Sequence, residues 1–224
     1  MRRFEGKVAA VTGAGSGIGR SLAVELARRG THLALSDVDE PGLAETATRC
    51  EGSGVKVITS LVDVADRGAV YAWADEVVAQ HGAVQLVVNN AGVALAATVE
   101  SMSYEDFEWL MAIDFWGVVY GTKAFLPHLK AAGEGHLVNI ASVFGLVSVP
   151  TQSAYNAAKF ACGASPTRCV WSSSSRAHRC RARRCTPGES RRTSPATPAW
   201  TTASAACSAT PMPTRPGRAS TGLR

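Results

Sequence analysis

The sequence has no apolar run that could cross a membrane and no apolar core of a secretory signal. A spanning helix needs about eighteen or more consecutive apolar residues, and the 224-residue chain contains no such run. Arg2 and Arg3 are followed by no apolar segment of the signal-peptide kind. We therefore expect a cytoplasmic protein with no membrane partner. Its length fits one domain, and its 46% hydrophobic content is ordinary for a globular chain.

Cysteine is scarce in the first part of the chain, whereas lysine and acidic residues are scarce in the second. Residues 1–161 contain one cysteine, Cys50, together with 12 basic and 17 acidic residues. Residues 162–224 contain no lysine, a single acid, 11 arginines and the other five cysteines. Few large apolar residues occur there, so burial cannot offset the entropy lost on ordering. We predict an incomplete folded domain over residues 1–161 and a disordered tail over residues 162–224.

Short apolar runs alternate with amphipathic segments through the first part of the chain. We predict strands over residues 8–11, 32–35, 55–62, 84–88 and 136–140. We predict helices over residues 18–29, 41–50, 69–80 and 106–132, the last with a break near Gly117. This alternation favours an α/β fold, a Rossmann-like doubly wound parallel sheet covered on both faces. Its C-terminal elements would be missing or replaced.

A glycine-rich turn, Thr-Gly-Ala-Gly-Ser-Gly-Ile-Gly at residues 12–19, follows the first predicted strand and opens the first predicted helix. Glycines allow a tight turn and close backbone approach, and a helix N-terminus offers free N–H groups to a phosphate. A glycine-rich loop without a ligand is the alternative, but the strand–turn–helix context favours a dinucleotide. The predicted contacts are Gly13, Ser16, Gly17, Ile18 and Gly19.

Polar residues follow the next three predicted strands. A carboxylate at Asp37 could accept both ribose hydroxyls of NAD and repel the 2′-phosphate of NADP, although Arg20 leaves NADP possible. Asp63 and Val64 could bind the adenine, and Asn90 lies in an Asn-Asn-Ala-Gly segment at residues 89–92. Each alone fits an ordinary turn. Together they would line one crevice at the carboxyl ends of the strands, where open α/β sheets bind ligands.

Tyr155 and Lys159 are four residues apart, which places them on one face of a helix. A neighbouring ammonium lowers the pKa of a phenol and makes it usable as an acid or base. Ser142 follows the fifth predicted strand and is well placed to hold a carbonyl oxygen. A chance Tyr and Lys on a surface helix is the alternative, and the upstream glycine turn argues against it.

With these motifs, residues 1–161 resemble the short-chain dehydrogenase/reductase family. The resemblance rests on the glycine turn, Asp63, the segment at residues 89–92, Ser142 and the Tyr-Asn-Ala-Ala-Lys run at residues 155–159. It implies hydride transfer between a nicotinamide cofactor and a secondary alcohol or ketone. Tyr155 would then exchange the hydroxyl proton, Lys159 would also bind the nicotinamide ribose, and Ser142 would polarise the substrate oxygen. Family members are commonly homo-oligomers, whereas the altered C-terminal part leaves this chain's state open.

One position departs from the family motif set. The family usually has an asparagine within the central helix, where its backbone carbonyl is thought to anchor a water on the proton path to the lysine. This sequence has Asp114, in Asp-Phe-Trp-Gly at residues 114–117. Aspartate keeps the shape and the carbonyl, and its charge would favour a protonated Lys159. We therefore assign Asp114 to the catalytic set and expect activity to tolerate it.

The sequence after Ala161 departs from the family altogether. If the reading frame of the gene is shifted one base upstream, the codons that follow Ala161 permit an amphipathic helix. In the same frame, residues 185–194 permit Val-His-Pro-Gly followed by Gly-Val-x-Thr-Asn-Ile, which resembles the family's next Pro-Gly segment. We hypothesise that one base was lost near the Ala161–Cys162 junction. An arginine-rich nucleic-acid arm over residues 176–184 is a rival. We expect no nucleic-acid partner. We also expect no metal, because the tail has no Cys-x-x-Cys pair. A non-catalytic remnant that binds only the dinucleotide is the remaining alternative.

Overall fold

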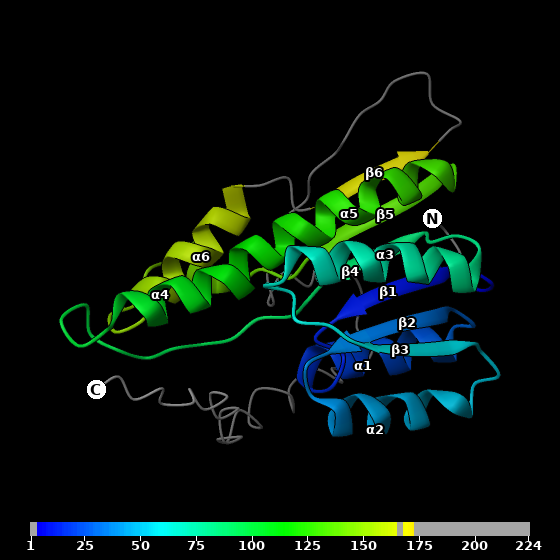
Figure 1. The fold of residues 1–224 in the computed structure, drawn as a ribbon, viewed down its shortest axis with the longest axis horizontal. Coiled ribbons are helices and arrows are strands. Elements are labelled where there is room, and N and C mark those ends of the chain that lie inside the picture. Colours follow the sequence, from blue (N-terminus) through cyan, green and yellow to red (C-terminus); the bar gives the residue numbers. More distant parts are fainter. Residues whose placement is uncertain (1–3, 165–167, 173–224) are drawn as a thin grey trace, which may run out of the picture. The chain divides into compact units, whose positions relative to one another are not determined.

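A six-stranded sheet forms the centre of the computed structural model, which describes residues 4–164 and 168–172. The strand order is β3-β2-β1-β4-β5-β6; the first five strands run parallel, and β6 runs antiparallel to β5 (Figure 1). The strands are β1 (Val8–Thr12), β2 (His32–Asp37), β3 (Val57–Leu61), β4 (Leu86–Asn89), β5 (Glu134–Asn139) and β6 (Arg168–Ser172). The carboxyl ends of β1 to β5 therefore meet at one edge of the sheet.

Helices cover both faces of this sheet, with α1 and α2 on one side and α3 and α5 on the other (Figure 1). Residues of β1 alternate between the layers, Val8 and Ala10 packing with α3 and α5, Ala9 and Val11 with α1 and α2. The helices are α1 (Gly17–Arg28), α2 (Glu40–Glu51), α3 (Arg67–His81), α4 (Tyr104–Met111), α5 (Gly117–Ala131) and α6 (Ser153–Ala164). A π-helical turn, η1 (Ala112–Trp116), joins α4 to α5, and a short 3-10 helix, η2 (Val143–Gly145), follows β5.

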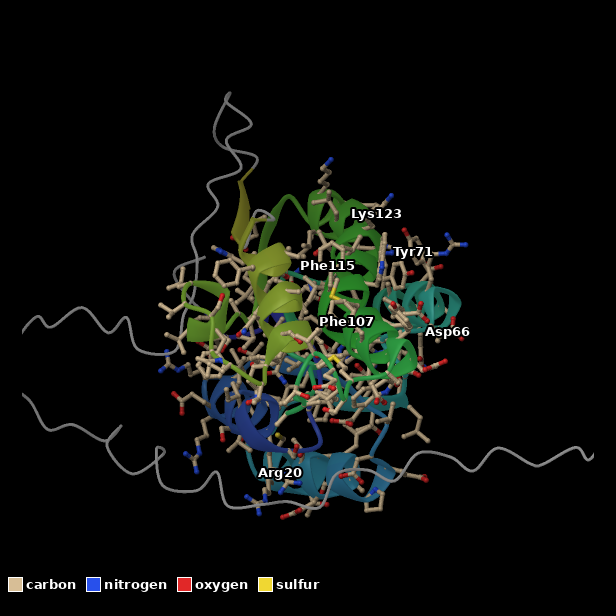
Figure 2. The ribbon with its side chains drawn as sticks, turned by 90° about the vertical axis from the view of Figure 1, so that its left-hand side faces the viewer. Arg20, Asp66, Tyr71, Phe107, Phe115 and Lys123 are labelled. Carbon is tan, nitrogen blue, oxygen red and sulfur yellow. The ribbon has the colours of Figure 1, made fainter. Side chains whose placement is uncertain are left out.

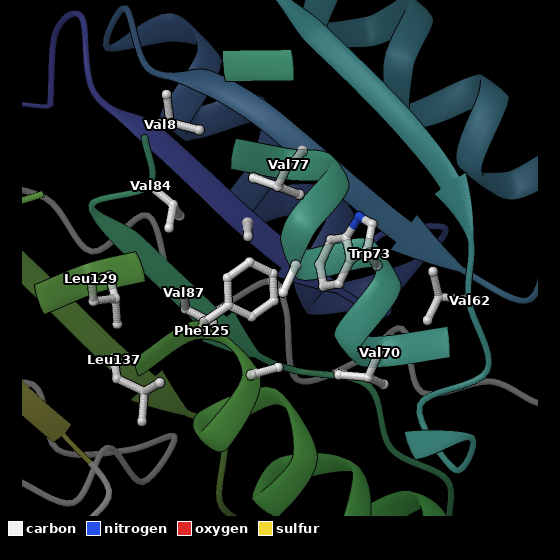
Figure 3. Close-up of a cluster of buried hydrophobic side chains, with 14 of the residues drawn as sticks. Val8, Val62, Val70, Trp73, Val77, Val84, Val87, Phe125, Leu129 and Leu137 are labelled. Atoms are coloured by element: carbon white, nitrogen blue, oxygen red, sulfur yellow. The ribbon is translucent and has the colours of Figure 1, made fainter. Parts of the chain in front are cut away.

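The larger core cluster lies between the sheet and the layer of α3 and α5 (Figure 3). Trp73 of α3 meets Phe125 of α5 edge-on, with ring centroids 5.1 Å apart and an interplanar angle of 81°. Both side chains are almost fully buried, and burying each one removes about 150–250 Å² of surface from water. This contact fixes α5 against α3 within the layer that covers the sheet, and so helps to position η1, which precedes α5.

Local sequence signals set the ends of several helices. Asp39 caps α2 by accepting a hydrogen bond from the Gly42 N–H, and Pro41 stands in the first turn, where no N–H is needed. Asp66 caps α3 through the N–H groups of Gly68 and Ala69. Gly82 ends α3 at φ 80°, a left-handed conformation that favours glycine. These caps explain why the helices begin and end close to the predicted positions.

The predicted α/β doubly wound fold is confirmed, and each predicted strand or helix end lies within two residues of the observed one. The predicted break near Gly117 is the π-helical turn η1, which interrupts one long helix. Figure 1 shows α4 and α5 as consecutive parts of that path. A π-bulge of this kind frequently occurs at functional sites because it re-aims the residues it contains.

Regular structure continues past residue 161, contrary to the expectation of a disordered tail starting at 162. Cys162 to Ala164 form the last residues of α6, because the Cys162 side chain is buried and its thiol donates to the Asp114 carbonyl. Residues 168–172 form β6, because the outer edge of β5 offers unpaired backbone groups to a neighbouring strand. The antiparallel direction was not predicted. The predictions for residues 165–167 and 173–224 lie outside the described residues.

Within the part of the chain that the structure describes, we find no helix both long and apolar enough to span a membrane.

Candidate functional site

The glycine turn folds tightly onto the end of β4, and at two of its glycines a side chain would collide with neighbouring backbone. Gly13 adopts φ 65°, and a Cβ there would lie 2.7 Å from the Ala91 Cα. A Cβ at Gly19 would lie 2.0 Å from the Gly13 carbonyl oxygen. Gly17, at φ 52°, starts α1 with open space around it. The turn therefore depends on glycine at positions 13 and 19 for space and at position 17 for its left-handed backbone, and its outer side is free at position 17.

The first backbone N–H groups of α1 receive no hydrogen bond acceptor from the side chain of the N-cap residue. Ser16 stands at the N-cap without a side-chain capping hydrogen bond. Ile18 lies in the first turn with 56% of its surface exposed. An uncapped helix start beside a glycine turn is the arrangement that binds anions through backbone N–H groups.

Asn90 and Thr12 tie the glycine turn to the end of β4. The Asn90 side-chain amide donates to the carbonyl oxygens of Thr12 and Gly13, both at 3.0 Å. The Thr12 hydroxyl oxygen accepts from the backbone N–H groups of Asn90 and Ala91, also at 3.0 Å. Asn90 was predicted as a binding residue, and the structure shows its amide engaged within the protein. These bonds hold the shape of the turn, and a contact of Asn90 with the dinucleotide stays a prediction.

Asp37 lies beside the turn at the end of β2. Its Oδ2 accepts from the Gly15 N–H at 2.7 Å, and its Oδ1 accepts from the N–H groups of Val38 and Asp39. The half-buried carboxylate therefore borders the turn from the side of β2. Arg20 lies between α1 and α2, toward the blue helices in Figure 2. Its guanidinium donates to the Thr46 hydroxyl and the Gly42 carbonyl and pairs with Glu45 at 2.8 Å.

Asp63 and Val64 follow β3 and have different surroundings. Asp63 is exposed, and its Oδ1 accepts from the Ala65 N–H at 2.8 Å. Val64 is buried against the start of α5, where a Cβ at Gly117 would lie 2.9 Å from its Cγ2. Val64 thus contributes packing that brings α5 close to the sheet, and Asp63 is the more accessible of the two predicted adenine contacts.

Tyr155 and Lys159 lie one turn apart on α6. The Lys159 Nζ lies 5.4 Å from the centroid of the Tyr155 ring, and the lysine is only 5% exposed. Ser142 caps η2 by accepting from the Phe144 N–H, and the Phe144 ring meets the Tyr155 ring edge-on at 6.0 Å. A Cβ at Gly145 would lie 2.6 Å from the Lys159 carbonyl oxygen, so η2 packs directly on α6. The three predicted residues therefore belong to one packed unit.

Asp114 is completely buried and contacts Lys159 directly. Its Oδ2 lies 2.9 Å from the Lys159 Nζ, and its Oδ1 accepts from the Val93 N–H at 2.7 Å. Burial raises the pKa of the Asp114 carboxyl, and the Lys159 ammonium opposes this only in part. Figure 2 shows the neighbouring Phe107 and Phe115 on this part of the long helix, and both pack against the cluster of Ala154 and Ala158 from α6.

Two contact residues at this centre, Val93 and Cys162, were absent from the sequence-based prediction, and a third, Gly92, entered it only as part of the segment at residues 89–92. Cys162 donates its thiol proton to the Asp114 carbonyl at 3.0 Å, and burial raises the pKa of that thiol to about 11. A Cβ at Gly92 would lie 3.2 Å from both Lys159 Nζ and Asp114 Oδ1, and Val93 supplies the N–H. The glycine of the segment at residues 89–92 was a usable signal. Nothing in the sequence indicated Cys162, since it lay in the predicted tail.

The contacts run continuously from the glycine turn to α6. Asn90 bonds the turn, Gly92 follows two residues later, and Gly92 borders both Asp114 and Lys159. Among the described residues, no group of three or more His, Cys, Asp or Glu side chains could hold a metal ion. The site therefore combines a glycine turn at the end of β1 with a buried Asp–Lys pair beside a tyrosine.

This sheet order, with the turn after its central strand, defines the Rossmann-like class of α/β folds. The family profile described as short chain dehydrogenase matches residues 7–191. The chain belongs to the short-chain dehydrogenase family.

Curated relatives carry oxidoreductase or dehydrogenase names. The putative oxidoreductase SadH of Mycobacterium tuberculosis (strain ATCC 25618 / H37Rv) is 57% identical over 161 residues, covering 72% of this chain and 58% of SadH. Estradiol 17-beta-dehydrogenase 11 of Homo sapiens is 43% identical over 160 residues, covering 70% of this chain and 52% of the human protein. The chain thus spans little more than half the length of these relatives.

Solved structures of the same family share the fold. A short-chain dehydrogenase/reductase from Burkholderia phymatum in complex with NAD has a TM-score of 0.71 and 41% identity, over 73% of this chain and 58% of that one. An NAD+-bound xylitol dehydrogenase has a TM-score of 0.69 and 33% identity, over 71% of this chain and 62% of that one.

Proposed function

We propose that this chain is a nicotinamide-dependent oxidoreductase that interconverts a secondary alcohol and a ketone. The observation that carries the proposal is Lys159, buried at 5.4 Å from the Tyr155 ring and linked through Gly92 to the glycine turn. An ammonium beside a phenol stabilises the phenolate and makes the side chain an acid/base. Family membership and the NAD-bound structures of two relatives support the proposal.

The glycine turn fits a dinucleotide on structural grounds. A Cβ at Gly13 or Gly19 would collide with neighbouring backbone, so the turn is held where a phosphate can approach main-chain N–H groups. The uncapped start of α1 adds the positive end of a helix dipole. The residues proposed to hold the pyrophosphate are Gly13, Ser16, Gly17, Ile18 and Gly19.

We propose NAD rather than NADP as the cofactor. The Asp37 carboxylate borders the turn, where it can accept the ribose hydroxyls and would repel a 2′-phosphate. Arg20 is the basic side chain near this position, and it already bonds Thr46, Gly42 and Glu45. Asp63 and Val64 would border the adenine, with Asp63 the exposed partner.

The residues at the end of the site have separate roles in this proposal. The nicotinamide, when bound, supplies or accepts the hydride. Tyr155 gives a proton to the substrate oxygen in ketone reduction and takes it back in alcohol oxidation. The Lys159 ammonium stabilises the phenolate and binds the nicotinamide ribose. The Ser142 hydroxyl donates to the substrate oxygen and polarises it, and Asp114 holds Lys159.

The test is Tyr155→Phe, compared with Tyr104→Phe as a matched control. Tyr104 is 88% exposed at the start of α4, so its hydroxyl serves no buried contact. We expect Tyr155→Phe to lower turnover about 10²–10⁴-fold, since a positioned acid/base contributes about that much. NADH and NADPH absorbance should be followed with estradiol and xylitol, the compounds in the names of two relatives described above.

Unchanged turnover in Tyr155→Phe would contradict the role given to this residue. A protein that binds NAD yet turns over no alcohol or ketone would favour the second candidate, a dinucleotide-binding remnant. That candidate draws on one observation, that the match to SadH covers 72% of this chain and leaves the rest unmatched. We further propose a small-molecule substrate as the partner and a cytoplasmic location. Members of the family are commonly homo-oligomers, and size-exclusion chromatography would measure the oligomeric state of this chain.

A further inference from the structure

Asp114 places a carboxyl group beside the lysine that is proposed to activate Tyr155, and the Lys159 ammonium favours the ionised form of that carboxyl against the effect of burial. The π-helical turn η1 directs its carboxylate inward, where Oδ2 lies 2.9 Å from Lys159 Nζ. The Asp114 side chain is fully buried and that of Lys159 is 6% exposed, so water screens this pair very little. The same ammonium lies 5.4 Å from the Tyr155 ring centroid. The Lys159 ammonium therefore lies between the Asp114 carboxyl and the Tyr155 ring.

Few other charges compete in this region. Lys159 and the Val93 N–H are the groups that favour an ionised Asp114 carboxyl. Cys162 lies close to both charges, but burial keeps its thiol neutral. The neighbouring part of α4 supplies apolar side chains, including Leu110 and Phe107. Among the described residues, α4 and α5 contribute no ionised group to the environment of Asp114.

We propose that Asp114 tunes Tyr155 through Lys159, by cancelling part of the field that the ammonium exerts on the phenol. An anion beside the ammonium leaves a nearly neutral pair, and a neutral pair stabilises a phenolate less than a lone cation does. Tyr155 then ionises at higher pH than it would beside an amide at position 114. Alcohol oxidation, which needs the phenolate, is thereby biased toward alkaline pH. This inference rests on the proposed function only for that last consequence.

Asp114 acts here as a positioning residue, because it contacts Lys159 and the backbone of Val93 rather than the reacting atoms. A merely structural role would change stability or turnover at all pH values together. A tuning role instead moves the pH at which Tyr155 ionises. The structural and the tuning role are separable in Asp114→Asn, because the Val93 N–H needs only an oxygen acceptor and the asparagine amide provides one.

The experiment is a spectroscopic titration of Tyr155 in Asp114→Asn. Phenolate absorbance is followed against pH, and the same titration of Tyr155→Phe in each background is subtracted to isolate this tyrosine. We expect the midpoint to move down by about 1 pH unit, the lower end of the effect of a close charge. Glu108→Gln removes an exposed carboxylate from α4 and should leave the midpoint unchanged. Asp114→Ser, also neutral, replaces Asp114→Asn should that variant not fold.

A second background tests whether the effect passes through the lysine. In Lys159→Met, substitution of Asp114 should no longer lower the midpoint, because the cation that the carboxylate opposes is gone. A midpoint that stays fixed or rises in Asp114→Asn, or a fall that persists without Lys159, would overturn the inference. The titration uses no substrate, so a protein that shows the shift but turns over no ketone contradicts the proposed function alone. In an active protein, the acid limb of kcat/KM should move with the titration.

Discussion

Gly19 illustrates, at the scale of single residues, how the glycine turn depends on the absence of a side chain. Its Cβ position lies 2.0 Å from the Gly13 carbonyl oxygen and 2.6 Å from the Asn90 amide nitrogen. Both neighbours are fixed, since the Asn90 amide donates to the Gly13 carbonyl. A methyl group there must displace the turn itself, which is the part of the chain proposed to meet the pyrophosphate.

Gly19→Ala should therefore weaken NADH binding by about tenfold or more, since a displaced turn loses phosphate hydrogen bonds of about 1.5 kcal/mol or more in total. The measurement is a fluorescence titration with NADH. Gly52→Ala is the matched control, because Gly52 ends α2 with ordinary helical backbone and no atom near its Cβ position. Equal affinity in Gly19→Ala and Gly52→Ala would refute the role of the turn, and thermal unfolding checks that each variant folds.

At the scale of elements, the start of α3 affects the stability of the fold, whereas the π-helical turn η1 affects the geometry of the site. Asp66 begins α3 by accepting from the N–H groups of Gly68 at 2.7 Å and Ala69 at 3.1 Å. The rest of α3 buries Val70, Trp73 and Val77 against the sheet. In contrast, η1 interrupts a long helix, and this interruption aims Asp114 at α6. The first boundary contributes stability, and the second contributes to the site.

Asp66→Ala should lower the free energy of unfolding by about 1 kcal/mol, the usual cost of losing an N-cap side chain. Gln80→Ala, an exposed change in the last turn of the same helix, should stay within about 0.5 kcal/mol of the parent. Urea denaturation measures both. NADH affinity should be unchanged in each, because α3 lies outside the site. A larger loss in Gln80→Ala than in Asp66→Ala would contradict the capping role.

At the scale of the whole molecule, the described domain contains the turn, the buried pair and the tyrosine, yet it spans just over half of its relatives' length. Val138 and Ile140, near the end of β5, are only partly buried on the side of α1 and α2. Apolar surface of this kind invites association unless other parts of the chain cover it. The frame-shift hypothesis for residues 162–224 would supply such parts.

Restoring the frame after Ala161 should raise the midpoint of thermal unfolding and allow turnover of secondary alcohols. In both proteins NAD should raise the midpoint further, because a ligand at about 100 times its dissociation constant stabilises the folded state by about 2.7 kcal/mol. The measurements are melting curves with and without NAD, beside the NADH assay. Equal stability and activity in the two chains would contradict the hypothesis, as would a gene without an open frame at that point.

Much of this fold follows from the sequence alone. Short apolar runs separated by amphipathic segments are sufficient to predict five strands and the helices between them, since burial of one helix face and both sheet faces imposes those periods. The sequence likewise places Gly13, Tyr155 and Lys159 correctly on a turn and a helix, because local spacing decides which residues share a face. Antiparallel β6 was not predictable in this way, since its direction depends on which edge of the sheet is free.

What the tertiary structure alone decided is which groups touch. The sequence indicated that Asp114 and Lys159 belong to one motif set, but not that the carboxylate pairs with the ammonium at 2.9 Å, nor that Val93 and Cys162 hold the same residue. The sequence also did not predict the hydrogen bonds that Asn90 and Arg20 make within the protein. The physical reason is that these contacts join residues far apart in the chain, whose distances are set by the packing of α5 on the sheet and of α6 on α4, η1 and η2 rather than by local spacing.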